Sequence, residues 1–152
     1  MNSLRYSYLL FFCLALSCSN QNEVRELLQA ALQENGIDLA EKSMVLIIPG
    51  SGCSTCIGMA EYGLKNTNQG TKLQTIFTKI DSYKSLKIRL GESFLQNPNI
   101  HVDQHRDFSR GELDSLYPVI AFVEAGMVKQ IETLTSDKND LVNAIVGIGD
   151  EE

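Results

Sequence analysis

The chain has 152 residues, 43% of them hydrophobic, which suffices for one domain with its own core and is too little for two domains of ordinary size. The formal net charge is −6 and no segment is rich in lysine or arginine, which disfavours binding to nucleic acid or to an anionic surface. Composition therefore predicts a single, modestly acidic globular domain.

The N-terminal residues up to Cys18 are typical of a targeting segment rather than of the fold. Arg5 supplies a positive charge, residues 9–16 form an apolar run too short to span a bilayer, and small residues precede Cys18. A cysteine at this place resembles the lipobox of bacterial lipoproteins. The resemblance implies a signal peptide at 1–17 and a lipid on Cys18, which would anchor the protein in a Gram-negative-type cell envelope, facing the periplasm. An ordinary secretory signal is the alternative, and both predict export.

A lipidated cysteine and short polar tether at 18–22 are expected to lead into one folded domain at 23–152. The domain begins with a predicted amphipathic helix over Glu23–Asn35, which Gly36 ends. We expect the helix to pack against a sheet and to carry no catalytic residue. Its apolar side chains recur at helical spacing: Val24, Leu27, Leu28, Ala31 and Leu32.

An apolar strand then leads directly to two cysteines. Residues 45–48 are an unbroken run of branched apolar side chains, which predicts a strand buried on both faces. A proline and two glycines at 49–52 end the strand. The apolar spacing over 57–64 predicts a helix behind them, so Cys53 and Cys56 lie on the first turn of that helix.

The start of a helix favours an anion, so the Cys53 thiol is expected to ionise more readily than a free cysteine. Cys53 is the candidate nucleophile, and Cys56, one turn later on the same face, is the candidate resolving thiol. A structural disulfide and a pair of metal ligands are the alternatives. The loop closed by this pair is too short to restrict the unfolded chain much, and His101 and His105 lie too far downstream for the usual zinc spacing. Redox chemistry is therefore favoured, with no metal.

A strand and a helix are predicted next. A polar turn at 66–70 precedes the strand Leu73–Ile80, whose side chains alternate so that its first and last residues face opposite sides. A helix capped by Asp81 or Ser82 is expected to run to about Phe94. This alternation of strands and helices implies parallel strands with right-handed crossovers, in which sites lie at the carboxyl ends of the strands.

Ile100–Asp103 is predicted to be a short strand with His101 facing outward. His101 and His105 could form a general base or a metal pair, but histidines near a strand end are more often solvated. A loop or short helix is expected between residues 107 and 117.

Pro118 is predicted to open the next strand, where its missing N–H is tolerated. That strand turns at Ala125-Gly126, and residues 127–134 return antiparallel as a hairpin. Ser136 or Asp137 is expected to cap a last helix with a buried apolar face: Leu141, Val142, Ile145 and Val146.

Two separate segments resemble the thioredoxin-like superfamily. The first reads Met-Val-Leu-Ile-Ile-Pro-Gly-Ser-Gly-Cys-Ser-Thr-Cys at 44–56, and the second reads Leu-Tyr-Pro-Val-Ile-Ala-Phe-Val-Glu-Ala-Gly-Met-Val at 116–128. The resemblance implies an α/β fold with a central mixed sheet flanked by helices. It also implies a cis peptide bond before Pro118, which would place the Tyr117 backbone beside Cys53 to bind an incoming chain. The extra strand before Pro118 is similar to the TlpA-like and peroxiredoxin-like branch.

The resemblance implies a docking groove formed by both segments: Gly52, Ser54, Thr55, Tyr117 and Pro118. The chain departs from the family in two ways. It has no tryptophan, so Gly52 replaces the aromatic residue that usually precedes the first cysteine. Ile47 stands where thioredoxins keep a buried carboxylate, so deprotonation of Cys56 would depend on water or on another carboxylate.

These observations predict an extracytoplasmic thiol-disulfide oxidoreductase that acts on proteins or small thiols and needs no bound cofactor. Its expected partners are thiol and disulfide proteins, an unidentified electron donor or acceptor, and the membrane through the lipid on Cys18. Peroxidase activity is disfavoured, because the residues before Cys53 do not match the peroxidatic pattern. The rival hypothesis is a non-catalytic binding module of the cell envelope with a structural Cys53–Cys56 disulfide.

Overall fold

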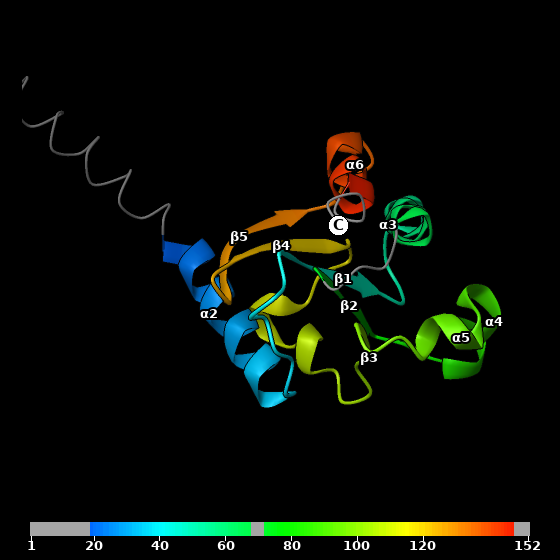
Figure 1. The fold of residues 1–152 in the computed structure, drawn as a ribbon, viewed down its shortest axis with the longest axis horizontal. Helices are drawn as coiled ribbons and strands as arrows, with labels where there is room; N and C mark the ends of the chain where they lie inside the picture. The colour runs from blue at the N-terminus through cyan, green and yellow to red at the C-terminus, as the bar shows by residue number, and fades with distance from the viewer. Residues whose placement is uncertain (1–18, 68–71, 148–152) are drawn as a thin grey trace, which may run out of the picture.

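The computed structural model describes residues 19–67 and 72–147. The predicted signal peptide, the predicted lipidation site Cys18 and most of the predicted turn at 66–70 lie outside these residues. Figure 1 shows the elements in chain order. Their bounds are α2 Ser19–Glu34, β1 Met44–Pro49, α3 Ser54–Asn66, β2 Leu73–Thr78, α4 Tyr83–Leu90, α5 Glu92–Leu95, β3 Ile100–Val102, the 3-10 helices η1 Asp107–Ser109 and η2 Gly111–Leu113, β4 Val119–Glu124, β5 Met127–Thr133 and α6 Asn139–Gly147.

The described strands form one mixed sheet of five strands in the order β3-β2-β1-β4-β5. β1, β2 and β3 are parallel, while β4 runs antiparallel to both β1 and β5. The register places Ile47 of β1 between Ile76 of β2 and Val119 of β4. This arrangement confirms the predicted α/β, thioredoxin-like fold. It also places the carboxyl ends of β1 and β2 at one edge of the sheet, where the segment bearing the cysteines begins.

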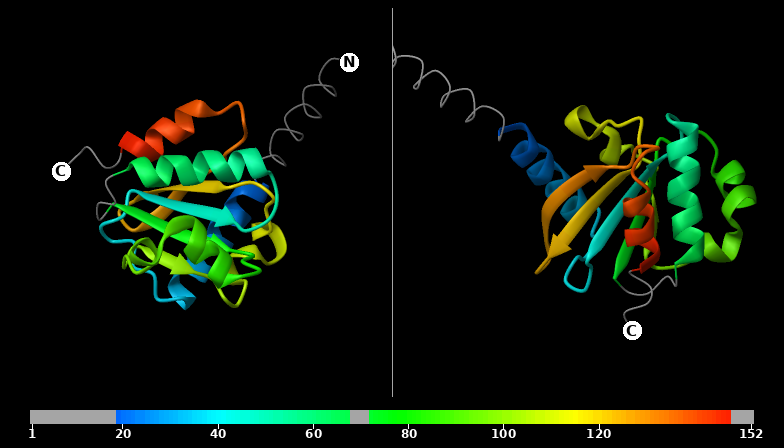
Figure 2. Two further views of the ribbon diagram at one scale, coloured as in Figure 1. Left: turned by 90° about the vertical axis from the view of Figure 1, so that its right-hand side faces the viewer. Right: turned by 90° about the horizontal axis from the view of Figure 1, so that it is seen from above.

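Helices cover both faces of the sheet, and β1 supplies side chains to both cores (Figure 2). Met44, Leu46 and Ile48 pack in the core beneath α3, α4 and α6. Val45 and Ile47 pack in the core beneath α2 and η1. All six residues of β1 are buried, which confirms the prediction of a strand covered on both faces. Full burial of each such side chain contributes about 1.5–3 kcal/mol, so β1 anchors the site firmly.

Helix α2 also covers the edge of the sheet at β5. The Arg25 guanidinium donates to the Lys129 carbonyl at 2.7 Å, and the Gln29 amide oxygen accepts from the Val128 N–H at 3.0 Å. The helix begins at Ser19, so the residues expected to form a polar tether lie in its first turn. Gly36, with φ of +67°, follows its end as predicted.

The helix expected to run from Ser82 to Phe94 is in fact two helices, α4 and α5. The Ser82 hydroxyl caps α4 as predicted, accepting from the Ser85 N–H at 3.2 Å. Gly91 separates the two helices with φ of +94° and ψ of +149°, a conformation that no helix contains. Leu90 and Leu95 nevertheless remain in the core on either side of this break.

The predicted alternation of the second strand fails at its end. Lys79 has a left-handed backbone with φ of +55°, so β2 ends at Thr78. The turn brings Ile80 onto the same core as Leu73 and Phe77, although strand alternation had placed it on the opposite face. The outward position expected for His101 is also wrong, because its half-buried ring lies edge-on against Phe108 with centroids 5.8 Å apart.

The C-terminal hairpin is confirmed. Ala125 and Gly126 both have positive φ, +51° and +74°, as in the type I′ two-residue turns that join antiparallel strands. The last helix begins at Asn139, slightly later than predicted. Leu141, Val142 and Ile145 are buried as predicted, whereas Val146 is half-buried. Across residues 19–67 and 72–147, no helix combines the length and apolar character needed for a membrane span.

Candidate active site

A disulfide joins Cys53 and Cys56 at the start of α3, with Cα atoms 5.3 Å apart. Cys53 is the N-cap residue, with an extended backbone at φ −66° and ψ 98°, and its Sγ accepts from the Cys56 N–H at 3.3 Å. The Cys53 carbonyl accepts the first helical hydrogen bond, from the Ile57 N–H at 2.9 Å. The predicted position of both sulfurs on the first helical turn is therefore confirmed.

The two sulfurs differ in access to solvent. Cys56, in the first turn of α3, is 1% exposed, whereas Cys53 is half-buried. Ser54 and Thr55, between them, are exposed. A thiolate from another molecule can therefore approach the disulfide at Cys53, whereas Cys56 is shielded by the protein.

The backbone of the loop before β4 contacts the segment that bears the cysteines, at Gly52 and Cys53. The Cys53 N–H donates to the Leu116 carbonyl at 2.8 Å. Gly52, with φ of +145°, permits this contact, because a Cβ at that position would lie 2.1 Å from the Leu116 oxygen. Leu116 was not among the residues predicted from the sequence. The one signal for it was the glycine before Cys53, which marks a close backbone approach.

A second backbone segment lies beside Gly50. A Cβ on Gly50 would lie 2.4 Å from the Lys79 carbonyl oxygen, and the Gly50 N–H donates to the Thr78 carbonyl at 2.7 Å. The Lys79 ammonium in turn contacts Asp114 Oδ1 at 2.6 Å and the Ser115 carbonyl at 3.4 Å. Lys79 thus links the end of β2 to the loop that contacts Cys53.

The prediction of a cis bond before Pro118 is wrong: no peptide bond among the described residues is cis. The trans form is the lower-energy isomer for a bond to proline, by about 0.5–1 kcal/mol, and the loop makes its contacts in that form. The Pro118 carbonyl accepts from the Leu134 N–H at 2.8 Å, and β4 begins one residue later, at Val119. Pro118 itself is buried.

The Tyr117 backbone is turned away from the cysteines. In a trans peptide the C=O and N–H point in opposite directions, so the Tyr117 N–H points away when the Leu116 C=O faces Cys53. That N–H donates to the Ser115 hydroxyl at 3.0 Å, and the same hydroxyl donates to the Tyr117 carbonyl at 2.9 Å. The structure therefore brings Gly52, Cys53 and Leu116 together, while Tyr117 offers its side chain, 40% exposed, rather than its backbone.

The buried carboxylates among the described residues contact groups other than the two cysteines. Ile47 is 6% exposed in the core beneath α2, so no carboxylate stands there. Asp103 accepts from the Thr78 hydroxyl at 2.7 Å and from two backbone N–H groups after β3. Glu61 lacks a well-aligned hydrogen bond at Oε1, but that oxygen lies 2.9 Å from the Arg89 guanidinium. No group of at least three His, Cys, Asp or Glu side chains within the described ranges is arranged to hold a metal.

Four side chains among the described residues have shifted pKa values. Burial lowers the pKa of Lys42, in the loop before β1. A hydrogen bond from Lys138 lowers the pKa of Glu132, and the same contact, at 2.7 Å, raises the pKa of Lys138. A hydrogen bond with Thr135 lowers the pKa of Asp137. Glu132 lies in β5, and Asp137 and Lys138 lie in the connection between β5 and α6, so none of these three groups belongs to the segment that bears the cysteines.

Comparisons with known proteins find little similarity. No protein-family model and no curated protein matches the sequence. Among solved structures, a thiol-disulfide isomerase from Corynebacterium glutamicum is similar, with 17% sequence identity and a TM-score of 0.46. The match covers 77% of this chain and 86% of that chain. A likeness of this extent does not assign the chain to a family.

Proposed function

We propose that this protein is a thiol-disulfide oxidoreductase that acts outside the cytoplasm, with Cys53 as the attacking thiol and Cys56 as the resolving thiol. The observation that carries the proposal is the unequal exposure of two bonded sulfurs on the first turn of one helix. A partner can reach Cys53, while Cys56 is protected until an internal attack is needed. A purely structural disulfide does not require this arrangement.

The start of α3 supplies the electrostatics of the reaction. The Cys56 N–H already points at the Cys53 sulfur, and the unpaired N–H groups of the first turn stabilise a negative charge there. The reduced Cys53 is therefore expected to be present as a thiolate more often than a free cysteine. Ser54 and Thr55 are exposed next to Cys53 in the chain, and their hydroxyls are proposed to donate hydrogen bonds to that thiolate.

The reaction begins when the Cys53 thiolate attacks one sulfur of a substrate disulfide. The substrate S–S bond breaks, a Cys53–substrate disulfide forms, and one substrate thiolate leaves. Cys56, after losing its proton to water, attacks the Cys53 sulfur and releases the second substrate thiolate. Two electrons have then passed from the protein dithiol to the substrate, and a second dithiol must return them. The same steps run in reverse when the oxidised protein meets a substrate dithiol.

The docking surface is proposed to consist of exposed side chains rather than of the Tyr117 backbone. Leu116 is 60% exposed and Tyr117 is 40% exposed, on the loop whose carbonyl contacts Cys53. These apolar side chains, together with Gly52, form one wall of the approach to the disulfide, whereas Pro118 is buried and offers no docking surface. Exposed apolar surface beside a reactive group favours polypeptide partners.

Location and attachment are proposed from the N-terminal sequence. The lipobox-like residues up to Cys18 support a lipid anchor and a position facing the periplasm. An oxidising surrounding supports disulfide exchange there. The short strand β3, inserted between the cysteines and Pro118, supports a place in the TlpA-like branch.

Trapping in cells tests the proposal. Full-length protein carrying Cys56→Ser is expected to accumulate disulfides between Cys53 and partner proteins, because no resolving thiol remains. The matched control is Cys53→Ser, which is expected to trap far fewer. A redox titration of the wild type adds a second readout: a catalytic pair equilibrates with thiol buffers, whereas a structural bridge resists reduction down to about −300 mV or below. Failure of both measurements would favour the non-catalytic binding module.

A further inference from the structure

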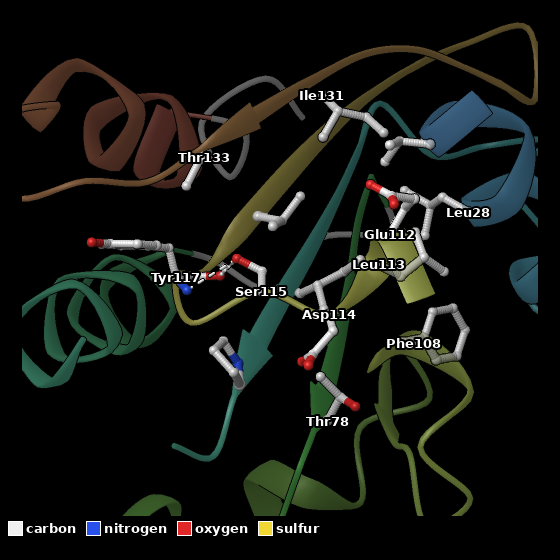
Figure 3. A pocket seen from close by; sticks show the side chains of 14 residues that line it. Leu28, Thr78, Phe108, Glu112, Leu113, Asp114, Ser115, Tyr117, Ile131 and Thr133 are labelled. Atoms are coloured by element: carbon white, nitrogen blue, oxygen red, sulfur yellow. Dashed lines mark hydrogen bonds between the residues drawn. The ribbon is translucent and has the colours of Figure 1, made fainter. Parts of the chain in front are cut away.

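A cavity of about 270 Å³ lies on the α2 face of the sheet, where β1 and β2 end (Figure 3). It is closed by α2 on one side and by the segment 112–117 on another. Its volume lies just below the range of about 300–1,000 Å³ typical of sites for whole small molecules. The cavity therefore suits one side chain of a larger partner. The apolar part of its lining includes Leu28, Ile47, Phe108, Leu113, Val119 and Ile131.

The loop that lines one side of the cavity also contacts Cys53. Ser115 and Tyr117 line it, and Leu116, between them in the chain, accepts the hydrogen bond from the Cys53 N–H. The cavity and Cys53 therefore lie on opposite sides of a single loop residue. An extended chain advances about 3.3 Å per residue, so two or three residues of a substrate span about 7–10 Å from the cysteine that reacts at Cys53.

The charge at the cavity is negative. Two carboxylates line it, Glu112 and Asp114, but Asp114 is held by Lys79 at 2.6 Å. Glu112 receives no hydrogen bond or ion pair from the described part of the chain, and Figure 3 shows its carboxylate among the apolar side chains of the cavity. The result is an apolar wall with one unpaired negative charge.

We infer that this cavity binds a lysine or arginine side chain of the polypeptide whose cysteine reacts at Cys53. The inference rests on the proposed function and adds a substrate preference to it. A long basic side chain lays its aliphatic stem on an apolar surface and carries its charge to the rim, where Glu112 lies. A leucine would fill the same space but leave the carboxylate beside an apolar group without a partner. A glutamate would be repelled.

Three matched peptides test the preference. Each carries one cysteine in a mixed disulfide with glutathione and, two residues away, lysine, norleucine or glutamate. Reduced full-length protein in detergent converts the mixed disulfide to the peptide thiol and glutathione while its own cysteines become oxidised. In this single turnover with peptide in excess, the peptide concentration that gives the half-maximal rate is expected to be about two- to fivefold lower for lysine than for norleucine, and highest for glutamate. Glu112→Gln is expected to abolish this difference, whereas Glu124→Gln, the same change at the far end of β4, is expected to keep it.

A second measurement separates this inference from the proposed function. The same peptides with serine in place of cysteine are titrated against the oxidised wild type and followed by NMR shifts of cavity residues. Tighter binding of the lysine peptide, with shifts at Leu113 and Val119, supports the cavity assignment even if no exchange occurs. Equal binding of lysine and norleucine peptides, or equal effects of Glu112→Gln and Glu124→Gln, overturns it. Exchange with bis(2-hydroxyethyl) disulfide, which carries no side chain, reports on the proposed function alone.

Discussion

Replacing Gly52 by alanine is expected to displace the loop at Leu116, whose carbonyl contacts Cys53. The alanine Cβ would lie 2.1 Å from the Leu116 carbonyl oxygen and 2.8 Å from its carbon, distances that no packed Cβ tolerates. Because the obstacle is backbone rather than a flexible side chain, relief requires the loop to move. Movement breaks the hydrogen bond between the Cys53 N–H and the Leu116 carbonyl.

Two contributions set the size of the Gly52→Ala effect. A φ of +145° is strained for an L-residue, at about 1–3 kcal/mol. Loss of the Cys53 to Leu116 hydrogen bond adds about 0.5–1.5 kcal/mol. We therefore expect the free energy of unfolding to fall by about 1.5–4.5 kcal/mol. Urea unfolding of the oxidised protein, followed by far-UV circular dichroism, measures it.

Gly58→Ala is the matched control for Gly52→Ala, since Gly58 lies within α3, the helix that follows, and an added Cβ there meets nothing within 4 Å. That change is expected to stabilise the protein by about 0.5–1 kcal/mol through helix propensity. Hydrogen exchange at the Cys53 amide gives a local readout, which is expected to speed up only in Gly52→Ala. A Gly52→Ala protein as stable as the wild type, with that amide still protected, would refute the reasoning.

Gly91→Ala meets no neighbour within 4 Å, so its backbone strain alone should lower the free energy of unfolding by about 1–3 kcal/mol in the same urea assay; no loss would mean that α4 and α5 can join. Lys79→Met removes the contact with the half-exposed Asp114, so the free energy of unfolding should fall by at most about 1 kcal/mol. Because the loop beside Cys53 is then less firmly held, dithiothreitol should reduce the disulfide faster, and an unchanged reduction rate contradicts this role. Lys138→Met should raise the pKa of Glu132 toward its ordinary 4.5, because the Lys138 hydrogen bond lowers it. The stability from that lowered pKa is present above 4.5 and lost as the pH falls through the folded-state pKa, so wild type and variant should converge in acid, as an NMR titration and urea unfolding against pH would show.

The sequence predicts those parts of the structure that depend on local pattern. The apolar run of β1, the turn at Ala125-Gly126 and the cysteines on a helix start all follow from residues that are close in the chain. The break at Gly91 was missed because the apolar spacing continues across it, and a single glycine in a helical pattern can be tolerated.

The contacts around the disulfide could not be predicted in the same way. Whether Leu116 or Tyr117 faces Cys53 depends on the orientation of one peptide plane, which the packing of the whole loop decides. The unequal burial of the two sulfurs depends on how α3 lies against the sheet. The cavity at Glu112 is lined by α2, by the ends of the strands and by the loop, so no segment of the sequence contains a signal for it.

The contacts of α2 with β5 bear on how copies of this protein behave when many lie close together. An outer strand with unpaired backbone groups can recruit the same strand of a neighbouring molecule and start aggregation. Here Arg25 and Gln29 occupy backbone groups at Lys129 and Val128 that such a neighbour would need. Helix α2 therefore disfavours pairing between the β5 strands of neighbouring molecules.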